Sequence, residues 1–210
     1  MKSSYISLGI ILLSFVIGAV SYSYMPDIMP THWNAQGEID GYMGKFWGLF
    51  FLPILSFGLF ILLMYMPKFE PRKDNFDSFS EYYQGIILMM TGFLFYIYIL
   101  SILAALEYEF NMVQMIAPAF AALFYYIGVT LQKTKSNFFV GIRTPWTISD
   151  DKVWEKTHNI GGTLFKVSGI ISLFGVFFKE IAIILILAPI LGAVVFVYIY
   201  SYLEYKKIQR

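Results

Sequence analysis

Apolar residues form six long runs along the chain, and shorter polar segments separate them. A helix needs roughly 17–25 mostly apolar residues to cross the hydrocarbon core of a bilayer. The runs are Tyr5–Tyr24, Phe46–Met66, Tyr82–Ala105, Val113–Leu131, Gly161–Phe178 and Ile181–Leu203. Only Lys179 and Glu180 separate the last two runs, which together are too long for one crossing and therefore predict a tight hairpin. The pattern predicts an all-α integral membrane protein with six transmembrane helices.

Composition supports a membrane protein and excludes several classes of function. The chain has 210 residues, of which 58% are apolar and 14% are charged, whereas about a quarter of a soluble domain is charged. Aromatic residues make up 20% of the chain, which suits a protein with two membrane interfaces. The net charge of +1 and the absence of a long basic run argue against a nucleic-acid partner. Because the chain has no cysteine, disulfides, thiolate catalysis and thiolate metal sites are excluded.

The distribution of Lys and Arg predicts the orientation of the spans, because positive charge is retained on the cytoplasmic side. With the N-terminus inside, the cytoplasmic segments hold twelve of these residues: Lys2, Lys68, Arg72, Lys73, Lys133, Lys135, Arg143, Lys152, Lys156, Lys206, Lys207 and Arg210. The outward loops hold Lys45 and Lys179, and Lys166 lies within the fifth run, from which it can snorkel. Both termini are therefore expected to be cytoplasmic.

The first outward loop, Met25–Lys45, is rich in turn-forming residues, which predicts a compact, ordered loop. Its candidate ligand-binding residues are Pro30, His32, Trp33, Asn34, Gly37 and Asp40. His32 and the nearby carboxylates of Asp27, Glu38 and Asp40 are possible ligands for a divalent cation, but their spacing matches no recognised metal site. A structural alternative places the His32 and Trp33 rings at the headgroup level, with Asp40 capping a turn.

The long inward loop, Gln132–Ile160, predicts a short helix at the membrane surface before the fifth span. Ser149 is the expected N-cap, because two acidic residues follow it. The helix is expected to run from Asp150 to Asn159 and to break at Gly161-Gly162. Val153, Trp154 and Thr157 then share one face, and His158 lies one turn beyond Trp154.

The same loop holds the candidate residues for contact with a cytoplasmic partner. They are Gly141, Arg143, Thr144, Pro145, Trp146, Trp154, Thr157 and His158. In the structural alternative, Trp146 and Trp154 are interfacial anchors and Arg143 contacts lipid phosphate. The Arg143 guanidinium can otherwise organise nearby carbonyls, pair with Asp150 or Asp151, or bind an acidic group of a partner.

Two motifs carry a resemblance to a known family. The outward motif Pro30-Thr31-His32-Trp33-Asn34 with Gly37 and Asp40-Gly41 resembles the loop of a widespread membrane domain of uncharacterised function. The inward motif, Gly141 to Thr147 followed by Val153-Trp154 and Thr157-His158, resembles the hallmark of the SdpI family. Both motifs in this order, with six spans, are similar to full-length SdpI-type immunity proteins. The expected domains are a two-span domain over residues 1–80 and a four-span SdpI-like domain over residues 81–210.

The resemblance implies a bacterial cell-membrane protein that protects a Gram-positive cell from a secreted peptide toxin of the sporulation-delaying type. It also implies a receptor role, in which toxin binding is relayed to a cytoplasmic transcriptional autorepressor. The expected partners are thus the toxin, membrane lipid and that repressor, with no cofactor, metal or catalytic residue. A small multi-pass transporter or channel is the alternative, although the spans show neither inverted repeats nor buried ionisable pathways. A membrane metalloenzyme is the weaker alternative.

Overall fold

The computed structural model describes residues 2–209. Within that range six helices are long and apolar enough to cross a membrane, which confirms the predicted all-α membrane architecture. They are α1 (Lys2–Ser21), α2 (Lys45–Tyr65), α4 (Ser80–Ala105), α5 (Met112–Leu131), α7 (Asp151–Leu173) and α8 (Ala182–Ile208). The shorter elements are β1 (Ile28–Trp33), β2 (Ile39–Gly44), η1 (Met66–Phe69), α3 (Lys73–Asp77), α6 (Pro145–Ser149), η2 (Phe174–Val176) and η3 (Lys179–Ile181).

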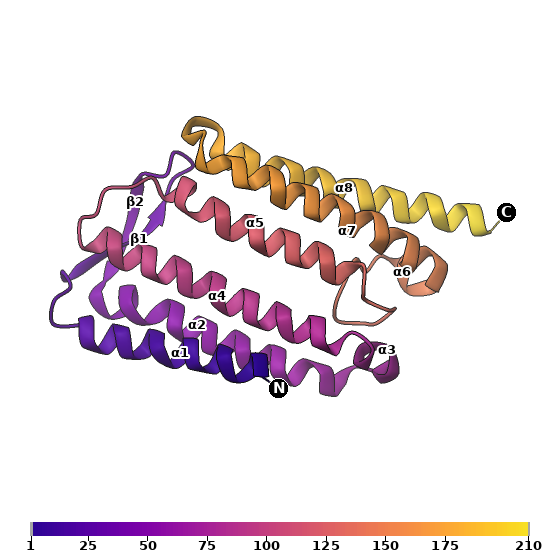
Figure 1. Cartoon of the computed structure of the whole chain (residues 1–210), viewed down its shortest axis with the longest axis horizontal. Coiled ribbons are helices and arrows are strands. Elements are labelled where there is room, and N and C mark those ends of the chain that lie inside the picture. Colours follow the sequence, from indigo (N-terminus) through magenta and orange to yellow (C-terminus); the bar gives the residue numbers. More distant parts are fainter. Residues whose placement is uncertain (1, 210) are drawn as a thin grey trace.

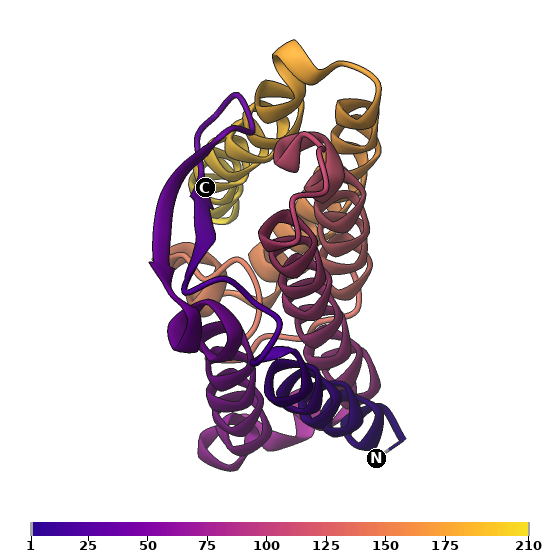
Figure 2. The same ribbon diagram turned by 90° about the vertical axis from the view of Figure 1, so that its left-hand side faces the viewer.

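The long helices form two groups that lie side by side (Figures 1 and 2). Helices α1, α2 and α4 pack against one another, and α5, α7 and α8 do the same, while α4 and α5 join the groups. The first group buries Ile11, Phe60 and Ile87 with Phe76 of α3, and the second buries Ala117 and Ile186. The predicted division at residue 80 stays a prediction, since α4 packs against helices on both sides of it.

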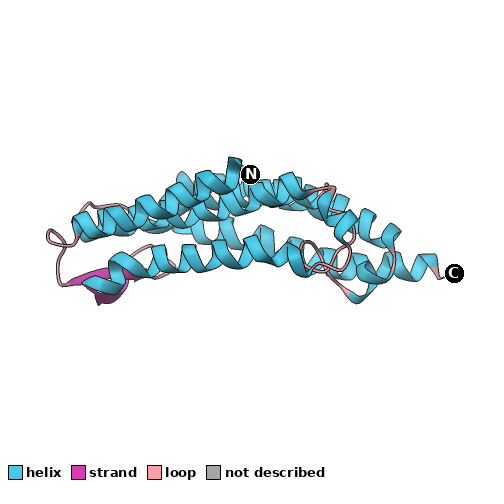
Figure 3. Ribbon diagram, turned by 90° about the horizontal axis from the view of Figure 1, so that it is seen from below, coloured by secondary structure: helices cyan, strands magenta, loops and turns pink. Residues whose placement is uncertain are grey.

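The two ends of the bundle carry different structures (Figure 3). The β1–β2 hairpin and the α4–α5 and α7–α8 connections lie at one end, called here the hairpin end. Helices α3 and α6 and the segment between α5 and α7 lie at the other, called here the loop end. The outward loop was predicted to be ordered but not to form strands, so the hairpin is an addition to the all-α prediction.

The predicted surface helix with a break at Gly161-Gly162 is wrong, because α7 continues through both glycines. A Cβ on Gly162 would lie 2.6 Å from the backbone oxygen of Gly128 in α5. A Cβ on Gly128 would in turn lie 2.5 Å from the backbone oxygen of Gly162. The glycines therefore let two helix backbones touch, which small residues do between transmembrane helices, and they do not end the helix.

The predicted N-cap at Ser149 is also wrong by one residue. The Asp150 carboxylate caps α7 by accepting hydrogen bonds from the backbone N–H groups of Lys152 (2.8 Å) and Val153 (3.0 Å). Ser149 instead ends α6, and its hydroxyl donates to the carbonyl of Pro145. An aspartate satisfies two free N–H groups here and adds a negative charge at the helix N-terminus, which a serine cannot do.

Lys166 makes a specific contact with the end of α5. Its Nζ donates to Oε1 of Gln132 at 2.8 Å, and Nε2 of Gln132 donates to the carbonyl of Asn159 and the hydroxyl of Thr163. Gln132 therefore ties the end of α5 to two turns of α7 close to the Gly128–Gly162 contact.

Candidate functional site

The outward candidate residues lie on the β1–β2 hairpin. The strands pair antiparallel, with Pro30 opposite Tyr42 and Trp33 opposite Ile39, and the register is irregular around His32. Asn34 forms the turn: its side-chain oxygen accepts from the backbone N–H groups of Gln36 (2.9 Å) and Glu38 (3.0 Å). This use of asparagine is typical of turns that carry their own side-chain hydrogen bonds. The sequence-predicted order of this loop thus has a local physical cause.

The tip of the hairpin is fixed to the start of α5. Nδ2 of Asn111 donates to the carbonyl of Gln36 at 2.6 Å, and Oδ1 of Asn111 caps α5 by accepting from the N–H of Gln114. Gly37 has a φ of +80° and lies against the Asn111 side chain, so a Cβ there would collide with it. Gly37 is therefore required for both the turn and the contact. Sequence reasoning missed Asn111, which a helix-capping pattern could have indicated.

The base of the hairpin is fixed to the other helix group. Met29 is fully buried in a cluster with Leu49 of α2 and with Tyr98 and Ile102 of α4. Lys45 pairs with Asp27 at 3.0 Å where the hairpin enters α2. Because its base packs on α2 and α4 and its tip on α5, the hairpin bridges the two helix groups (Figure 2).

His32 and Asp40 form an exposed pair across the two strands. Nδ1 of His32 lies 2.5 Å from Oδ1 of Asp40, and 72% of the His32 side chain is exposed. The suggestion that Asp40 caps a turn is thus wrong, since Asn34 performs that role. Among residues 2–209 no cluster of three or more His, Cys, Asp and Glu side chains is placed to hold a metal ion. The pair is available for contact with a ligand from outside the chain.

The inward candidate residues lie at the opposite end of the bundle and converge on His158. Nε2 of His158 accepts from the backbone N–H of Ile142 at 2.9 Å, so Nδ1 carries the proton that is donated to the carbonyl of Trp154 at 2.8 Å. The His158 ring is 1% exposed and stacks on Trp154 with a centroid separation of 3.9 Å. Gly141 has a φ of +124°, and a Cβ there would collide with Nε2 of His158. The predicted shared face of Val153, Trp154, Thr157 and His158 is confirmed by their burial.

The two predicted interfacial tryptophans have different surroundings. Trp154 is 2% exposed and its Nε1 donates to the carbonyl of Thr134 at 3.0 Å, so it is part of the protein core and not a membrane anchor. Trp146 packs instead on Tyr198 and Tyr202 of α8. An indole N–H that is buried needs a hydrogen-bond partner, and the loop supplies it for Trp154.

The remaining residues of the inward motif shape the turn into α6. Thr144 caps α6 with Thr147 in a reciprocal pair of hydrogen bonds, and Pro145 occupies the first turn. Oγ1 of Thr144 also donates to Oγ of Ser201 in α8 at 3.0 Å. Thr157 is buried, and its hydroxyl has no hydrogen-bond partner within residues 2–209. The contacts of Thr144 and Thr147 explain these two threonines as structural elements of the loop.

Arg143 uses its guanidinium within its own loop. Nη1 donates to the carbonyl of Phe138, and the side chain is otherwise exposed. Of the three uses considered from the sequence, the structure therefore shows the contact with a nearby carbonyl. Within residues 2–209, Arg143 forms no ion pair with Asp150 or Asp151. The exposed face of the guanidinium is available to a partner.

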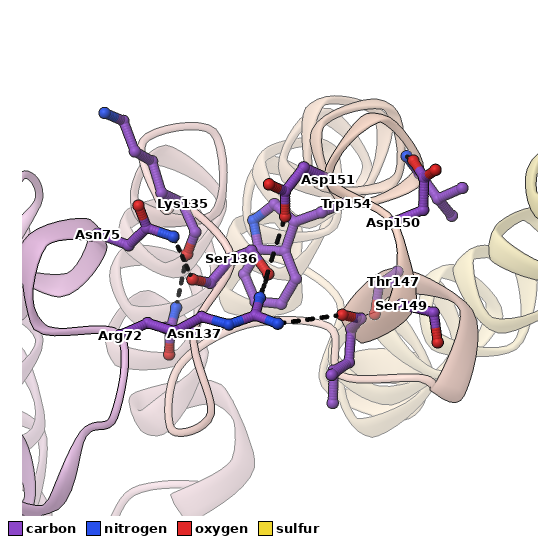
Figure 4. Close-up of polar contacts among 12 residues, drawn as sticks. Arg72, Asn75, Lys135, Ser136, Asn137, Thr147, Ser149, Asp150, Asp151 and Trp154 are labelled. Atoms are coloured by element: carbon purple, nitrogen blue, oxygen red, sulfur yellow. Dashed lines mark hydrogen bonds and ion pairs between the residues drawn. The ribbon is translucent and has the colours of Figure 1, made fainter.

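The connection between α2 and α4 forms hydrogen bonds with the inward loop (Figure 4). Sequence reasoning missed these contacts. Nη1 of Arg72 lies 3.9 Å from Asp151, its Nη2 donates to the carbonyl of Ile148, and it also bonds the hydroxyl of Ser136. Nδ2 of Asn75 donates to the carbonyl of Ser136 at 2.8 Å. Arg72 was counted in the sequence only as a charge that sets orientation, and nothing in its neighbours indicated a partner more than 60 residues away.

Glu70, which is buried, also holds the inward loop through a hydrogen bond. It is 3% exposed, and its carboxylate accepts from the backbone N–H groups of Phe138 (3.0 Å) and Arg72 (2.9 Å). A buried carboxylate needs such donors.

Beside these contacts a polar cleft of about 300 Å³ opens. It is lined by Asn75, Gln132, Lys135, Asp151, Glu155 and Asn159, with Trp154 and His158 also in its wall.

The fold and both loops define the class of this protein. Six membrane-spanning helices, an ordered hairpin at one end and a tightly bonded loop at the other describe a multi-pass helical membrane protein.

Comparison with known proteins specifies this class further. Residues 133–201 match the SdpI/YfhL protein family, and residues 9–57 match a domain of unknown function, DUF1648. The chain is 27% identical to "Immunity protein SdpI" of Bacillus subtilis (strain 168) over 212 residues, covering 99% of this chain and 98% of the relative. No solved structure matches the chain. The resemblance to the SdpI/YfhL family is confirmed, and the protein is a multi-pass protein of the bacterial cell membrane.

Proposed function

We propose that this protein protects the bacterial cell by binding a secreted peptide toxin of the sporulation-delaying type, without degrading it. The observation that carries the proposal is the similarity to an immunity protein over 99% of the chain. The hairpin adds support, because it is held at its base and its tip yet exposes His32, Asp40, Tyr42 and Met43. An exposed loop on a rigid scaffold is a frequent place for recognition.

Direct binding tests this proposal. The purified protein in lipid nanodiscs is titrated with a fluorescent sporulation-delaying peptide, and empty nanodiscs provide the control for partition into lipid. We expect saturable binding beyond that of empty nanodiscs, with the peptide recovered intact by mass spectrometry. Equal binding to both kinds of nanodisc would contradict a toxin receptor, and cleaved peptide would indicate an enzyme.

The exposed pair on the hairpin gives a first prediction. His32→Ala and Asp40→Ala should weaken protection against the peptide while the amount of protein in the membrane stays the same. The physical reason is that an exposed pair contributes little to folding, so its loss removes a contact surface and leaves the fold intact. Survival and membrane abundance are measured together, and an equal fall in both would show a structural role.

We also propose that the loop end reports toxin binding to a cytoplasmic transcriptional repressor. Helix α5 supports this role because it connects the two ends of the bundle. Its N-cap residue Asn111 contacts the hairpin tip, and the carbonyl of Thr134, just after its last turn, accepts a hydrogen bond from Nε1 of Trp154. The close approach of the Gly128 and Gly162 backbones joins α5 directly to α7. A change at the hairpin thus has a continuous path of contacts to the cleft.

Arg143 gives a second prediction, for the loop end. Arg143→Lys should impair a repressor-dependent reporter at unchanged abundance, and Arg143→Ala should be at most slightly worse. Lysine keeps the charge but lacks the planar donor geometry that serves the Phe138 carbonyl and a partner at once. The reporter and membrane levels are measured in both variants. Full activity of Arg143→Lys would remove this residue from the proposed partner surface.

The proposed roles require the hairpin end to face outward and both termini to be cytoplasmic, which is a third prediction. Because the chain has no cysteine, single substitutions report directly. An impermeant maleimide added to whole cells should label Gln36→Cys and Glu109→Cys, but not Asp77→Cys or Glu155→Cys. Labelling after cell lysis shows that the last two sites are reactive, and labelling of Glu155→Cys in whole cells would contradict this orientation.

A further inference from the structure

A groove of about 460 Å³ opens on the side of the bundle where α1, α4 and α5 meet. Its lining is Ile10, Leu88, Met89, Gly92, Phe93, Tyr96, Pro118, Ala119 and Ala122. These residues lie near the middle of α1 and α4 and in the first half and the middle of α5. The groove is therefore at the depth of the hydrocarbon core, away from both candidate ligand sites.

Contacts between α4 and α5 set the limits of the groove along the bundle. On one side of it the Tyr96 hydroxyl donates to the carbonyl of Met115 at 2.9 Å. On the other side the Tyr126 hydroxyl donates to the carbonyl of Tyr82 at 3.2 Å. The two helices are thus hydrogen-bonded to each other on both sides of the groove.

Small residues create the hollow between these two ties. Gly92, Ala119 and Ala122 face it with little or no side chain, and a Cβ on Gly92 would meet nothing within 4 Å. Phe93 is held at one wall by an edge-to-face contact with Phe120, with ring centroids 5.0 Å apart. Tyr96 carries the one polar side-chain group among the lining residues, a hydroxyl that donates to the carbonyl of Met115.

We propose that this groove binds one acyl chain of a membrane lipid. Its volume lies within the range of about 300–1,000 Å³ usual for ligand sites. An empty apolar hollow loses the dispersion contacts of its lining atoms, and lipid tails surround it on its open side. A peptide would bring many backbone N–H and C=O groups, whereas the side chains of the lining offer them only the Tyr96 hydroxyl oxygen as an acceptor. The proposal does not depend on the immunity role.

Glycine substitutions test the proposal with a matched control. Gly92→Leu places a side chain in the groove, whereas Gly58→Leu adds the same side chain to α2, where a Cβ also meets nothing within 4 Å. The full-length variants are reconstituted with a phosphatidylglycerol that carries a photoreactive diazirine in the middle of one acyl chain. After illumination, crosslinked peptides are quantified by mass spectrometry.

We expect crosslinks of the wild type to concentrate in residues 88–96 and 118–122, and this excess to be lost in Gly92→Leu but kept in Gly58→Leu. A thermal melt shows whether Gly92→Leu still folds. If it does not, Ala122→Phe, which fills the groove from α5, replaces it as the test variant. An even distribution of crosslinks over all lipid-facing helices, or an excess that survives both groove variants, would overturn the proposal. Displacement of the wild-type crosslinks by added toxin peptide would also overturn it, because the groove would then be a peptide site.

Discussion

Gly162→Leu is expected to remove most of the folded protein from the membrane. The Cβ of any residue at this position would lie 2.6 Å from the backbone oxygen of Gly128, and that oxygen cannot move without moving α5. Overpacking of a core typically costs about 1–3 kcal/mol, and a collision with a helix backbone lies at or above the upper end. Separation of α5 and α7 would also break the hydrogen bonds of Gln132 to Asn159 and Thr163.

Gly192→Leu is the matched control, because Gly192 lies in α8 and a Cβ there meets nothing within 4 Å. Membrane abundance and the midpoint of thermal unfolding in detergent are compared for the two variants. Gly192→Leu should resemble the wild type. A Gly162→Leu protein that melts at the wild-type temperature would show that α5 and α7 do not touch at this point.

His158→Ala is expected to destabilise the loop end, by less than Gly162→Leu destabilises the helix packing. The substitution leaves a hole beneath Gly141 and removes the acceptor of the Ile142 N–H. A buried donor without a partner costs about 1–3 kcal/mol, and the loss of the stacked ring adds a cavity term. We expect a lower unfolding midpoint and faster proteolysis within the segment between α5 and α7.

His158→Gln separates the hydrogen bond from the ring. Glutamine offers an acceptor for the Ile142 N–H but cannot stack on Trp154, so it should recover part of the lost stability. Limited proteolysis and thermal melting of both variants give the comparison. If His158→Ala is as stable as the wild type, the buried histidine does not organise the inward loop.

The spans could be predicted from the sequence because lipid imposes a simple requirement on each of them. A run of about 20 apolar residues has one stable solution in a bilayer, which is a helix. The misreading at Gly161-Gly162 shows the limit of this reasoning. Glycine is common at the ends of helices in soluble proteins. Within a helix it can instead allow close packing of a neighbouring helix, and here Gly162 packs against Gly128 of α5.

The two candidate sites differ in how much of them the sequence revealed. Asn34 and Gly37 act on their own turn, so the order of the outward loop was predictable. Glu70 and Arg72 act on residues more than 60 positions away. Such pairings arise because the α2–α4 connection meets the segment between α5 and α7 at the loop end. Their residue types carry no local signal of a partner.

The central claim, toxin protection by binding, is tested most directly by survival of a sensitive bacterium. Cells that express this chain and cells with an empty vector are exposed to the purified sporulation-delaying peptide, and intact peptide in the medium is followed by mass spectrometry. Verified membrane expression is the condition for the comparison. The account predicts higher survival of the expressing cells with the peptide still intact, and equal survival of the two strains would contradict it.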